Sequence, residues 1–392
     1  MGTRARRAFR RPSTVLLSGL LLVASLLLVA LLEGGARAFH RLRSGDWAPT
    51  RVSAMHDQIA IARQVYRPHA FLNVALREDA RIHVYGREIA VNSLGYRSPE
   101  RPLRKPAGVL RVLCAGGSTT FDIRAQSNDL TWPSLLEREL RRRGQPAEVW
   151  NAGVPGWTSL ENVISLASRD LDLEPDLIVL LQGVNDLQPA AWLPFDRQYE
   201  QGHAALVRRH LGLDLGPISL ADRSVLLETL NDLLHGPRDP LHVLARVKRV
   251  ELGTSSRTTV PPEALATFER NIRSLLALAR DHHIAVVLVP QLTRIRADVA
   301  DSDYALIGIW IPGLLPAAVP AQLQKMNDVL RRLAAGAGPR LVDLTRSPDW
   351  QDVDFGDPWH FSAQGSEHFA RLLADPVAQE LARAKHAAET AR

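Results

Sequence analysis

The sequence predicts an α/β fold with a parallel sheet, preceded by a single membrane-spanning helix. From residue 109 onward, short apolar runs typical of buried strands alternate with stretches of helical periodicity, and short connections join them. Ahead of this pattern, residues 15–32 form an apolar run without a charged residue. The chain has 392 residues, which is enough for one large domain with insertions or for two domains.

The expected elements follow one another as βα units. Strands are expected at 109–115, 147–150, 176–181, 284–289 and 341–344, and helices near 130–143, 159–170, 263–282, 319–335 and 363–384. Residues 188–260 interrupt this rhythm, so we expect a helical insertion over one end of the sheet, either a lid or a packed excursion. The main domain then covers 108–385, and 33–107 form a connector with a small β lead-in.

The N-terminal apolar run is long enough to cross a membrane. At about 1.5 Å per residue, residues 15–32 span about 27 Å, close to the hydrocarbon thickness of a bilayer. Arginines and no acidic residue precede the run, which predicts a cytoplasmic tail at 1–14, a single-pass anchor at 15–32 and an extracytoplasmic, periplasmic domain. Ala36-Arg37-Ala38 resembles a signal-peptide cleavage site, so a cleaved signal sequence stays an alternative. Either interpretation exports the domain.

The composition argues against several classes of function. The formal net charge is +6, but the arginines are scattered, apart from the N-terminal cluster and Arg141-Arg142-Arg143. A nucleic-acid-binding protein would show a basic stripe with interleaved aromatic residues, so no nucleic-acid partner is expected. Cys114 is the single cysteine and is interpreted as a core residue. No spacing of His, Cys or carboxylate residues indicates a metal site.

Polar residues and a glycine follow the expected strands at positions that can converge. Ser118 follows the first strand, Gly153 the second and Asn185 the third, while Asp357 and His360 lie between the last strand and the last helix. The carboxyl ends of parallel strands meet at one edge of a sheet, where ligands bind. We therefore expect these residues to share one site despite their large separations in sequence.

These residue types suit acyl-transfer chemistry. A serine hydroxyl needs a base to take its proton, and His360 is the candidate base for Ser118. Asp357 can reach back to hold the other ring nitrogen of His360. The N–H groups of Ser118 and Gly153, together with the Asn185 amide, can stabilise an oxyanion. The glycine-rich turn before Ser118 would alone suit a phosphate equally well, but a phosphate site requires neither a base nor its orienting carboxylate.

Four sequence blocks together resemble the SGNH hydrolase superfamily, also called GDSL-like esterases and lipases. They are Gly116-Gly117-Ser118-Thr119, Asn151-Ala152-Gly153, Gly183-Val184-Asn185-Asp186 and Asp357-Pro358-Trp359-His360, in a resemblance that covers about 108–385. The resemblance implies a three-layer α/β/α, flavodoxin-like fold, catalysis by Ser118, Asp357 and His360, and no cofactor. It also implies an oxyanion hole formed by Ser118, Gly153 and Asn185.

One position departs from the pattern of the family. Gly117 stands where the family has an aspartate before the nucleophile. That aspartate is generally structural, so the departure does not exclude activity. The Gly-Gly-Ser-Thr form resembles that of membrane-anchored bacterial members.

The resemblance and the apolar run together predict a membrane-anchored serine esterase or O-deacylase. Its substrate would be an acyl ester, and the exported location favours an acylated glycan of the envelope or of a secreted polysaccharide. One alternative is a polysaccharide O-acyltransferase that uses the same site with a sugar hydroxyl as acceptor. Another is a non-catalytic, membrane-anchored protein for glycan binding or assembly. The oligomeric state stays open.

Overall fold

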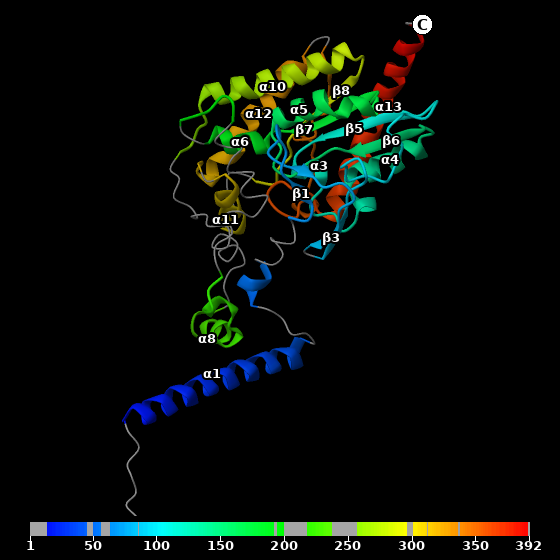
Figure 1. The fold of residues 1–392 in the computed structure, drawn as a ribbon. Coiled ribbons are helices and arrows are strands. Elements are labelled where there is room, and N and C mark those ends of the chain that lie inside the picture. Colours follow the sequence, from blue (N-terminus) through cyan, green and yellow to red (C-terminus); the bar gives the residue numbers. More distant parts are fainter. Residues whose placement is uncertain are drawn as a thin grey trace, which may run out of the picture. The chain divides into compact units, whose positions relative to one another are not determined.

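A five-stranded sheet forms the centre of the larger of two units in the computed structural model of the chain (Figure 1). The larger unit comprises Asp57–Gly216 and Leu244–Arg392, and the smaller unit comprises Met1–His56 and Pro217–Val243. The structure describes residues 14–44, 50–55, 63–84, 86–191, 194–199, 218–236, 257–295, 301–311, 313–335 and 338–390.

The sheet has the strand order β6-β5-β7-β8-β9, and every neighbouring pair is parallel. Its strands are β5 (Leu110–Gly116), β6 (Ala147–Asn151), β7 (Leu177–Gln182), β8 (Ala285–Pro290) and β9 (Arg340–Leu341). Counted along the chain, this is the 2-1-3-4-5 order of flavodoxin-like sheets, whose ligands bind where the strand order reverses. The predicted flavodoxin-like parallel sheet is therefore confirmed.

Both faces of this sheet are buried, and successive side chains along a strand point to opposite faces. In β7, Leu177, Val179 and Leu181 belong to one cluster of buried side chains, whereas Ile178 and Leu180 belong to the other. Strands that are buried on both faces contain continuous apolar runs rather than an alternation of apolar and polar residues. This explains why the central strands could be recognised from the sequence.

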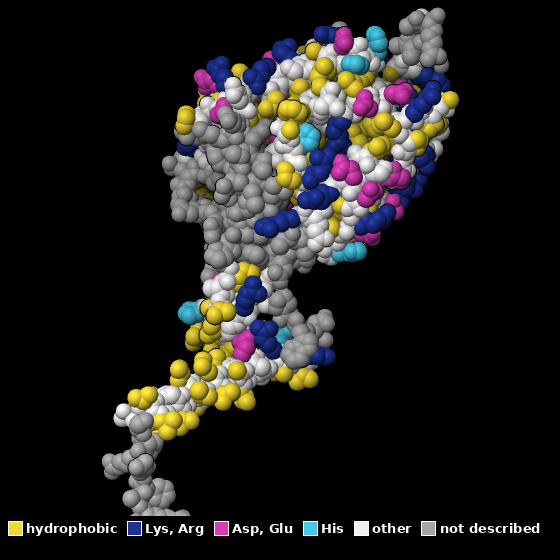
Figure 2. All heavy atoms as spheres, viewed as in Figure 1, with side chains coloured by type: hydrophobic (Ala, Val, Ile, Leu, Met, Phe, Trp, Pro, Cys, Tyr) yellow, Lys and Arg dark blue, Asp and Glu magenta, His cyan; other side chains and the backbone are white. Residues whose placement is uncertain are grey.

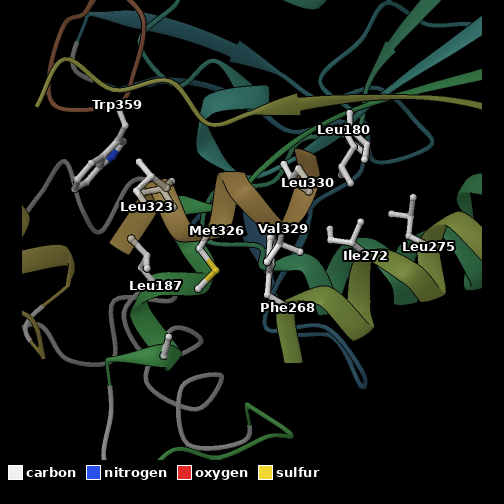
Figure 3. Close-up of a cluster of buried hydrophobic side chains, with 14 of the residues drawn as sticks. Leu180, Leu187, Phe268, Ile272, Leu275, Leu323, Met326, Val329, Leu330 and Trp359 are labelled. Carbon is white, nitrogen blue, oxygen red and sulfur yellow. The ribbon is translucent and has the colours of Figure 1, made fainter. Parts of the chain in front are cut away.

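Helices cover both faces of the sheet, which gives the predicted three layers (Figure 1). One face is covered by α5 (Ser159–Ser168), α6 (Val184–Ala190), α10 (Pro262–Asp281) and α12 (Val319–Ala334), and the other by α4 (Trp132–Arg142) and α13 (Ala363–Thr390). On α10, Phe268, Ile272 and Leu275 follow one another at helical spacing and form a single buried stripe (Figure 3).

Two small antiparallel ribbons precede the sheet in sequence. In them, β1 (Tyr66–Arg67) pairs with β2 (Ala75–Leu76), and β3 (Arg81–Val84) pairs with β4 (Arg87–Ala90). Their buried side chains form a third cluster together with Phe121, Val154 and Trp157. Phe121 is the last residue of the short helix α3 (Ser118–Phe121), so these ribbons support the helix that begins with the candidate nucleophile.

Arg97, which follows the ribbons, is fully buried against the end of α3. Its guanidinium donates hydrogen bonds to the carbonyl oxygens of Phe121 at 3.0 Å and Asp122 at 2.9 Å. It also lies over the Phe121 ring, 4.6 Å from the centroid. Burial lowers the pKa of Arg97 to about 10, so the side chain stays charged at neutral pH. The charge is therefore partnered by backbone oxygens at the C-terminal end of α3.

The structure differs from the sequence-based expectation mainly in short elements. Helices α3, α6 and α11 (Asp301–Trp310) were not expected. A helix of one to three turns shows too few repeats for its periodicity to be read reliably. Strand β9 has two residues, whereas a strand was expected over 341–344.

The smaller unit contains α1 (Thr14–Ser44), a short helix at 51–55 and α8 (Val225–His235). Within α1, the segment Thr14–Leu42 is long and apolar enough to cross a membrane, and it meets this test by length and composition alone. The predicted cytoplasmic tail lies outside the described residues, apart from its last residue.

The expected insertion at 188–260 is divided between the two units, because Pro217–Val243 belong to the smaller one. Its helix α8 belongs to the same compact unit as α1, to which it is joined by hydrogen bonds. Periodicity showed that this segment is helical but could not show what it packs against. The stretches 200–217 and 237–256 of the insertion lie outside the described residues.

Replacing Arg97 by Met should lower the free energy of unfolding by about 3–5 kcal/mol, because buried carbonyl oxygens lose their charged donor. Denaturant unfolding followed by near-ultraviolet circular dichroism measures this loss. The exposed Arg104→Met is the matched control and should stay within about 0.5 kcal/mol of the parent. Equal stability of the two variants would contradict the role given to Arg97.

Candidate active site

Ser118 lies at the first position of α3, directly after β5 ends at Gly116. Gly116 has a φ of +152°, and a Cβ there would lie 2.4 Å from the carbonyl oxygen of Leu181 in the neighbouring strand. Only glycine permits this tight exit from the sheet. The turn leaves the Ser118 side chain at the carboxyl edge of the sheet, as expected from the sequence.

Gly117 has a local explanation in the neighbouring Asn185. A Cβ at position 117 would lie 2.1 Å from Asn185 Nδ2, so any side chain there would force the amide to move. Asp122 does not occupy the place of the missing aspartate. It is buried behind α3, where its carboxylate accepts hydrogen bonds from Trp132 N at 2.8 Å and Ser366 Oγ at 2.7 Å.

His360 and Asp357 form a continuous chain of hydrogen bonds with Ser118. Ser118 Oγ lies 2.7 Å from His360 Nε2, and His360 Nδ1 lies 2.8 Å and 2.9 Å from the two carboxylate oxygens of Asp357. The backbone N–H of His360 also donates to Asp357 at 2.9 Å. With the Nδ1 proton held by the carboxylate, Nε2 is free to accept the serine proton.

Asp357 is held in its ionised form. Burial alone would raise its pKa, but the neighbouring His360, hydrogen bonds from that residue and the charge of Arg124 lower the pKa to about 2. Arg124 Nη1 lies 3.4 Å from the carboxylate, and a Cβ at Gly356 would lie 2.0 Å from Arg124 Nε. Glycine at 356 therefore leaves room for this arginine, whose place beside Asp357 has no signal in the sequence.

The loop that carries His360 is held by hydrogen bonds within itself and to a neighbouring segment. A backbone bridge pairs Phe355 with Phe361 across the loop. The carbonyl oxygen of Pro358 accepts hydrogen bonds from Thr293 Oγ1 at 2.7 Å and from the N–H of Arg294 at 3.1 Å. These contacts attach the loop to the segment that follows β8.

Asn185 follows β7 and lies in the first turn of α6. Its Nδ2 donates to the carbonyl oxygen of Trp157 at 2.9 Å, which uses one amide hydrogen and leaves the second for a ligand. The next residue, Asp186, is fully buried and accepts hydrogen bonds from Ser159 and Gln182. Asp186 thereby joins the start of α5 to the helix that carries Asn185.

Gly153 is placed differently from the prediction. Its N–H donates to Asn151 Oδ1 at 3.1 Å, and a Cβ at this position would lie 2.2 Å from the backbone nitrogen of Phe121. Glycine is needed at 153 because the loop packs against the backbone of α3, so its amide is not the expected oxyanion donor.

Gly156 occupies the position that Gly153 was expected to take. It lines a cavity with Ser118, Asn185 and His360, and within the described ranges its N–H makes no hydrogen bond. The sequence did contain a signal for this residue, because Gly156 is a second glycine in the same loop and follows Pro155.

The cavity beside Ser118 has a volume of about 60 Å³. Apolar side chains form much of its wall, namely Ile123, Pro155, Val184, Trp310, Ile311 and Trp359. Trp310 is the last residue of α11 and Ile311 follows it, in a segment that carries no functional signal in the sequence. In the part of the chain that the structure describes, no cluster of three or more His, Cys, Asp or Glu residues could hold a metal ion.

Several solved structures are similar to this chain at low sequence identity. A lipase/acylhydrolase from Enterococcus faecalis is 17% identical, with 69% of this chain and 96% of that chain covered and a TM-score of 0.38. A carbohydrate acetylesterase family member from Sinorhizobium meliloti is 16% identical, with 70% and 99% covered and a TM-score of 0.39. An acetyl xylan esterase is 15% identical, with 68% and 100% covered and a TM-score of 0.39. No curated protein sequence matches the chain.

A family match covers most of the sheet domain. The GDSL-like lipase/acylhydrolase family matches residues 114–368, which is more than half of the chain and contains all four sequence blocks. The expectation of an SGNH-type enzyme is thereby confirmed. The chain belongs to the GDSL-like lipase/acylhydrolase family and is an SGNH-type ester hydrolase.

Proposed function

We propose that this ester hydrolase is a serine esterase in which Ser118, His360 and Asp357 act as nucleophile, base and orienting carboxylate. The observation that carries the proposal is the unbroken hydrogen-bond chain from Ser118 Oγ through the imidazole to the carboxylate. A serine hydroxyl is a weak nucleophile until a base removes its proton, and this arrangement supplies the base in the required orientation.

In the first half-reaction, Ser118 Oγ attacks the ester carbonyl carbon while His360 Nε2 takes the hydroxyl proton. The tetrahedral intermediate carries a negative oxygen, for which the N–H groups of Ser118 and Gly156 and the second Asn185 amide hydrogen are the donors. His360 then gives its proton to the alcohol oxygen as the carbon–oxygen bond of the ester breaks. The alcohol leaves, and an acyl group remains on Ser118.

In the second half-reaction, water attacks the acyl-enzyme with His360 again acting as base. The carboxylic acid leaves, and Ser118 recovers its proton. Asp357 keeps its negative charge throughout, because its pKa of about 2 lies far below the working range of an imidazole base. Its role is to orient the ring and to stabilise the imidazolium, without itself accepting a proton.

The size of the cavity supports a short acyl group on the substrate. A cavity of about 60 Å³ has room for only a few non-hydrogen atoms. Its apolar wall suits a methyl or ethyl group better than a charged one. We therefore propose an O-deacylase for small esters such as acetyl groups.

The contact between α1 and α8 supports a retained membrane anchor. Glu33 accepts hydrogen bonds from Ser224 Oγ at 2.7 Å and from the N–H of Val225 at 2.9 Å, at the start of α8. Cleavage near Ala36-Arg37-Ala38 would remove Glu33 and leave these donors without their acceptor. We propose a single-pass anchor with a cytoplasmic N-terminus and a hydrolase domain outside the cytoplasm. An acylated glycan of the envelope is the substrate class that suits this location.

Ser118→Ala should reduce ester hydrolysis by about 10⁶-fold or to the detection limit, since no nucleophile remains. Turnover of p-nitrophenyl acetate and labelling by a fluorophosphonate probe measure the loss, and the melting temperature should be unchanged. Ser168→Ala, at an exposed serine of α5, is the control and should keep both activity and labelling. Undiminished turnover by Ser118→Ala would exclude the proposed nucleophile.

Asn185→Ala should lower kcat by about 10²–10³-fold with little change in KM, because the lost donor acts mainly on the charge of the transition state. Steady-state kinetics with a short ester separates the two parameters. Gln324→Ala removes an exposed amide of α12 and serves as the control. An increase in KM at unchanged kcat would instead assign Asn185 to ground-state binding.

Acetyl esters should be hydrolysed with a kcat/KM at least about tenfold higher than octanoyl esters, because the longer chain exceeds the cavity. A series of p-nitrophenyl esters of increasing chain length measures this preference, and acetylated xylan or another acetylated glycan tests the leaving group. Equal or faster turnover of the octanoyl ester would rule out the proposed acyl specificity. Acyl transfer to a sugar hydroxyl in place of water would appear as an acylated product.

A further inference from the structure

Helix α8 carries an apolar face that is exposed in the structure. Four of its leucines are largely exposed, namely Leu227 at 48%, Leu230 at 45%, Leu233 at 77% and Leu234 at 75%. At about 100° per residue, these side chains fall within roughly 120° of the helix surface. A single exposed leucine is ordinary for a protein surface, but a contiguous stripe of four indicates an interaction surface.

The opposite face of α8 is polar and already partnered. Arg51 donates through its guanidinium to both carboxylate oxygens of Asp232, at 2.6 Å and 2.7 Å, and its backbone N–H donates to Glu228 at 3.1 Å. These contacts fix the rotation of α8 within the smaller unit. The leucine stripe is therefore held on the side of the helix away from Arg51.

The position at which α8 is attached to α1 indicates which environment surrounds the leucine stripe. Glu33, whose carboxylate binds the start of α8, is the first residue after the uncharged run 15–32. Arg37, one turn further, donates to the carbonyl oxygen of Arg223 at 2.8 Å. Helix α8 is thus attached where α1 would leave the hydrocarbon layer, which is the level of the lipid headgroups.

The hydrophobic surface of α1 continues onto α8. Apolar side chains cover α1 along its length, and others lie on the neighbouring α8 (Figure 2). Arg37, which pairs with Glu33 at 2.8 Å, and Arg41 lie on α1 just beyond the apolar run, at the level where headgroups would lie. An exposed apolar stripe, a polar opposite face and basic neighbours are the features of a helix that lies in the membrane interface.

We propose that α8 lies in the bilayer interface with its leucine stripe inserted at the headgroup–acyl boundary. The protein then contacts lipid at two points, through the spanning helix α1 and through the surface-bound helix α8. The proposal rests on the retention of α1 as an anchor, and it is independent of the catalytic residues. Neither a second copy of the chain nor another part of the same chain is needed to cover the stripe.

Site-specific fluorescence in vesicles tests the proposal on the full chain. Leu230→Cys and Leu234→Cys, each labelled with the environment-sensitive dye NBD, report on the leucine stripe. Thr229→Cys places the same dye on an exposed position of another face of α8 and is the matched control. The parent chain measures background labelling, because its single cysteine, Cys114, is buried. The vesicles contain phosphatidylcholine and phosphatidylglycerol with brominated acyl chains.

The dye at 230 or 234 should emit at shorter wavelength and lose at least about half of its intensity to the bromines, as expected for a depth of roughly 5–10 Å. The dye at 229 should do neither. A blue-shifted but unquenched dye at 230 and 234 would show that protein covers the stripe, and water-like emission would show that nothing does. Either result, or equal quenching at 229, would overturn the proposal.

The intact mass of each labelled sample shows whether α1 is present. A protein cleaved after Ala38 would overturn the anchor on which the proposal rests, while leaving the esterase proposal untouched. Turnover of p-nitrophenyl acetate in the same vesicles is a separate readout. Inactive protein with normal quenching would contradict the catalytic proposal alone.

Discussion

The position of Ser118 depends on how the polar groups behind α3 are satisfied. Helix α3 has four residues, and a helix of this length is not stable by itself because nucleation costs more than its few hydrogen bonds return. Arg97 donates hydrogen bonds to the carbonyl oxygens at its C-terminal end, and Trp132 Nε1 donates to the carbonyl oxygen of Thr119 at 2.9 Å. Asp122 terminates the helix in the left-handed region at φ +59° and ties α4 and α13 to it. The helix that begins with Ser118 is thereby held by buried polar contacts from three other segments, namely the one that contains Arg97, α4 and α13.

Two buried aspartates near the site, Asp186 and Asp357, have pKa values that their surroundings shift in opposite directions. Burial, assisted by the nearby charge of Glu161, raises the pKa of Asp186 to about 6, although hydrogen bonds from Ser159 and Gln182 act to lower it. Asp357 is also buried, but the charges of His360 and Arg124 lower its pKa to about 2. Raising the pH through 6 therefore reduces the stability that Asp186 contributes, whereas Asp357 loses its contribution only in strong acid. The free-energy cost of burying an ionised Asp186 is offset by its hydrogen bonds, which join the start of α5 to α6.

The sequence was sufficient to predict the sheet and the convergence of Ser118, Asn185 and His360. Both follow from continuous apolar strands, whose carboxyl ends lie on one edge of a parallel sheet. The choice between Gly153 and Gly156 could not be made in this way, because both are glycines of one loop and only their contacts distinguish them. Helix α11 was missed because it is short and weakly amphipathic, although its end and the residue after it contribute to the cavity wall.

The chain connects the smaller unit, which contains α1 and α8, to the sheet domain at three points. The segment that contains α8 leaves the sheet domain after α6, the helix that carries Asn185, and it returns before α10. The N-terminal route from α1 enters the same domain through the ribbons that pack on Phe121 of the nucleophile helix. Two of the three covalent connections between the units therefore adjoin either the helix that carries Asn185 or elements that pack on the helix that begins with Ser118, and the third leads into α10.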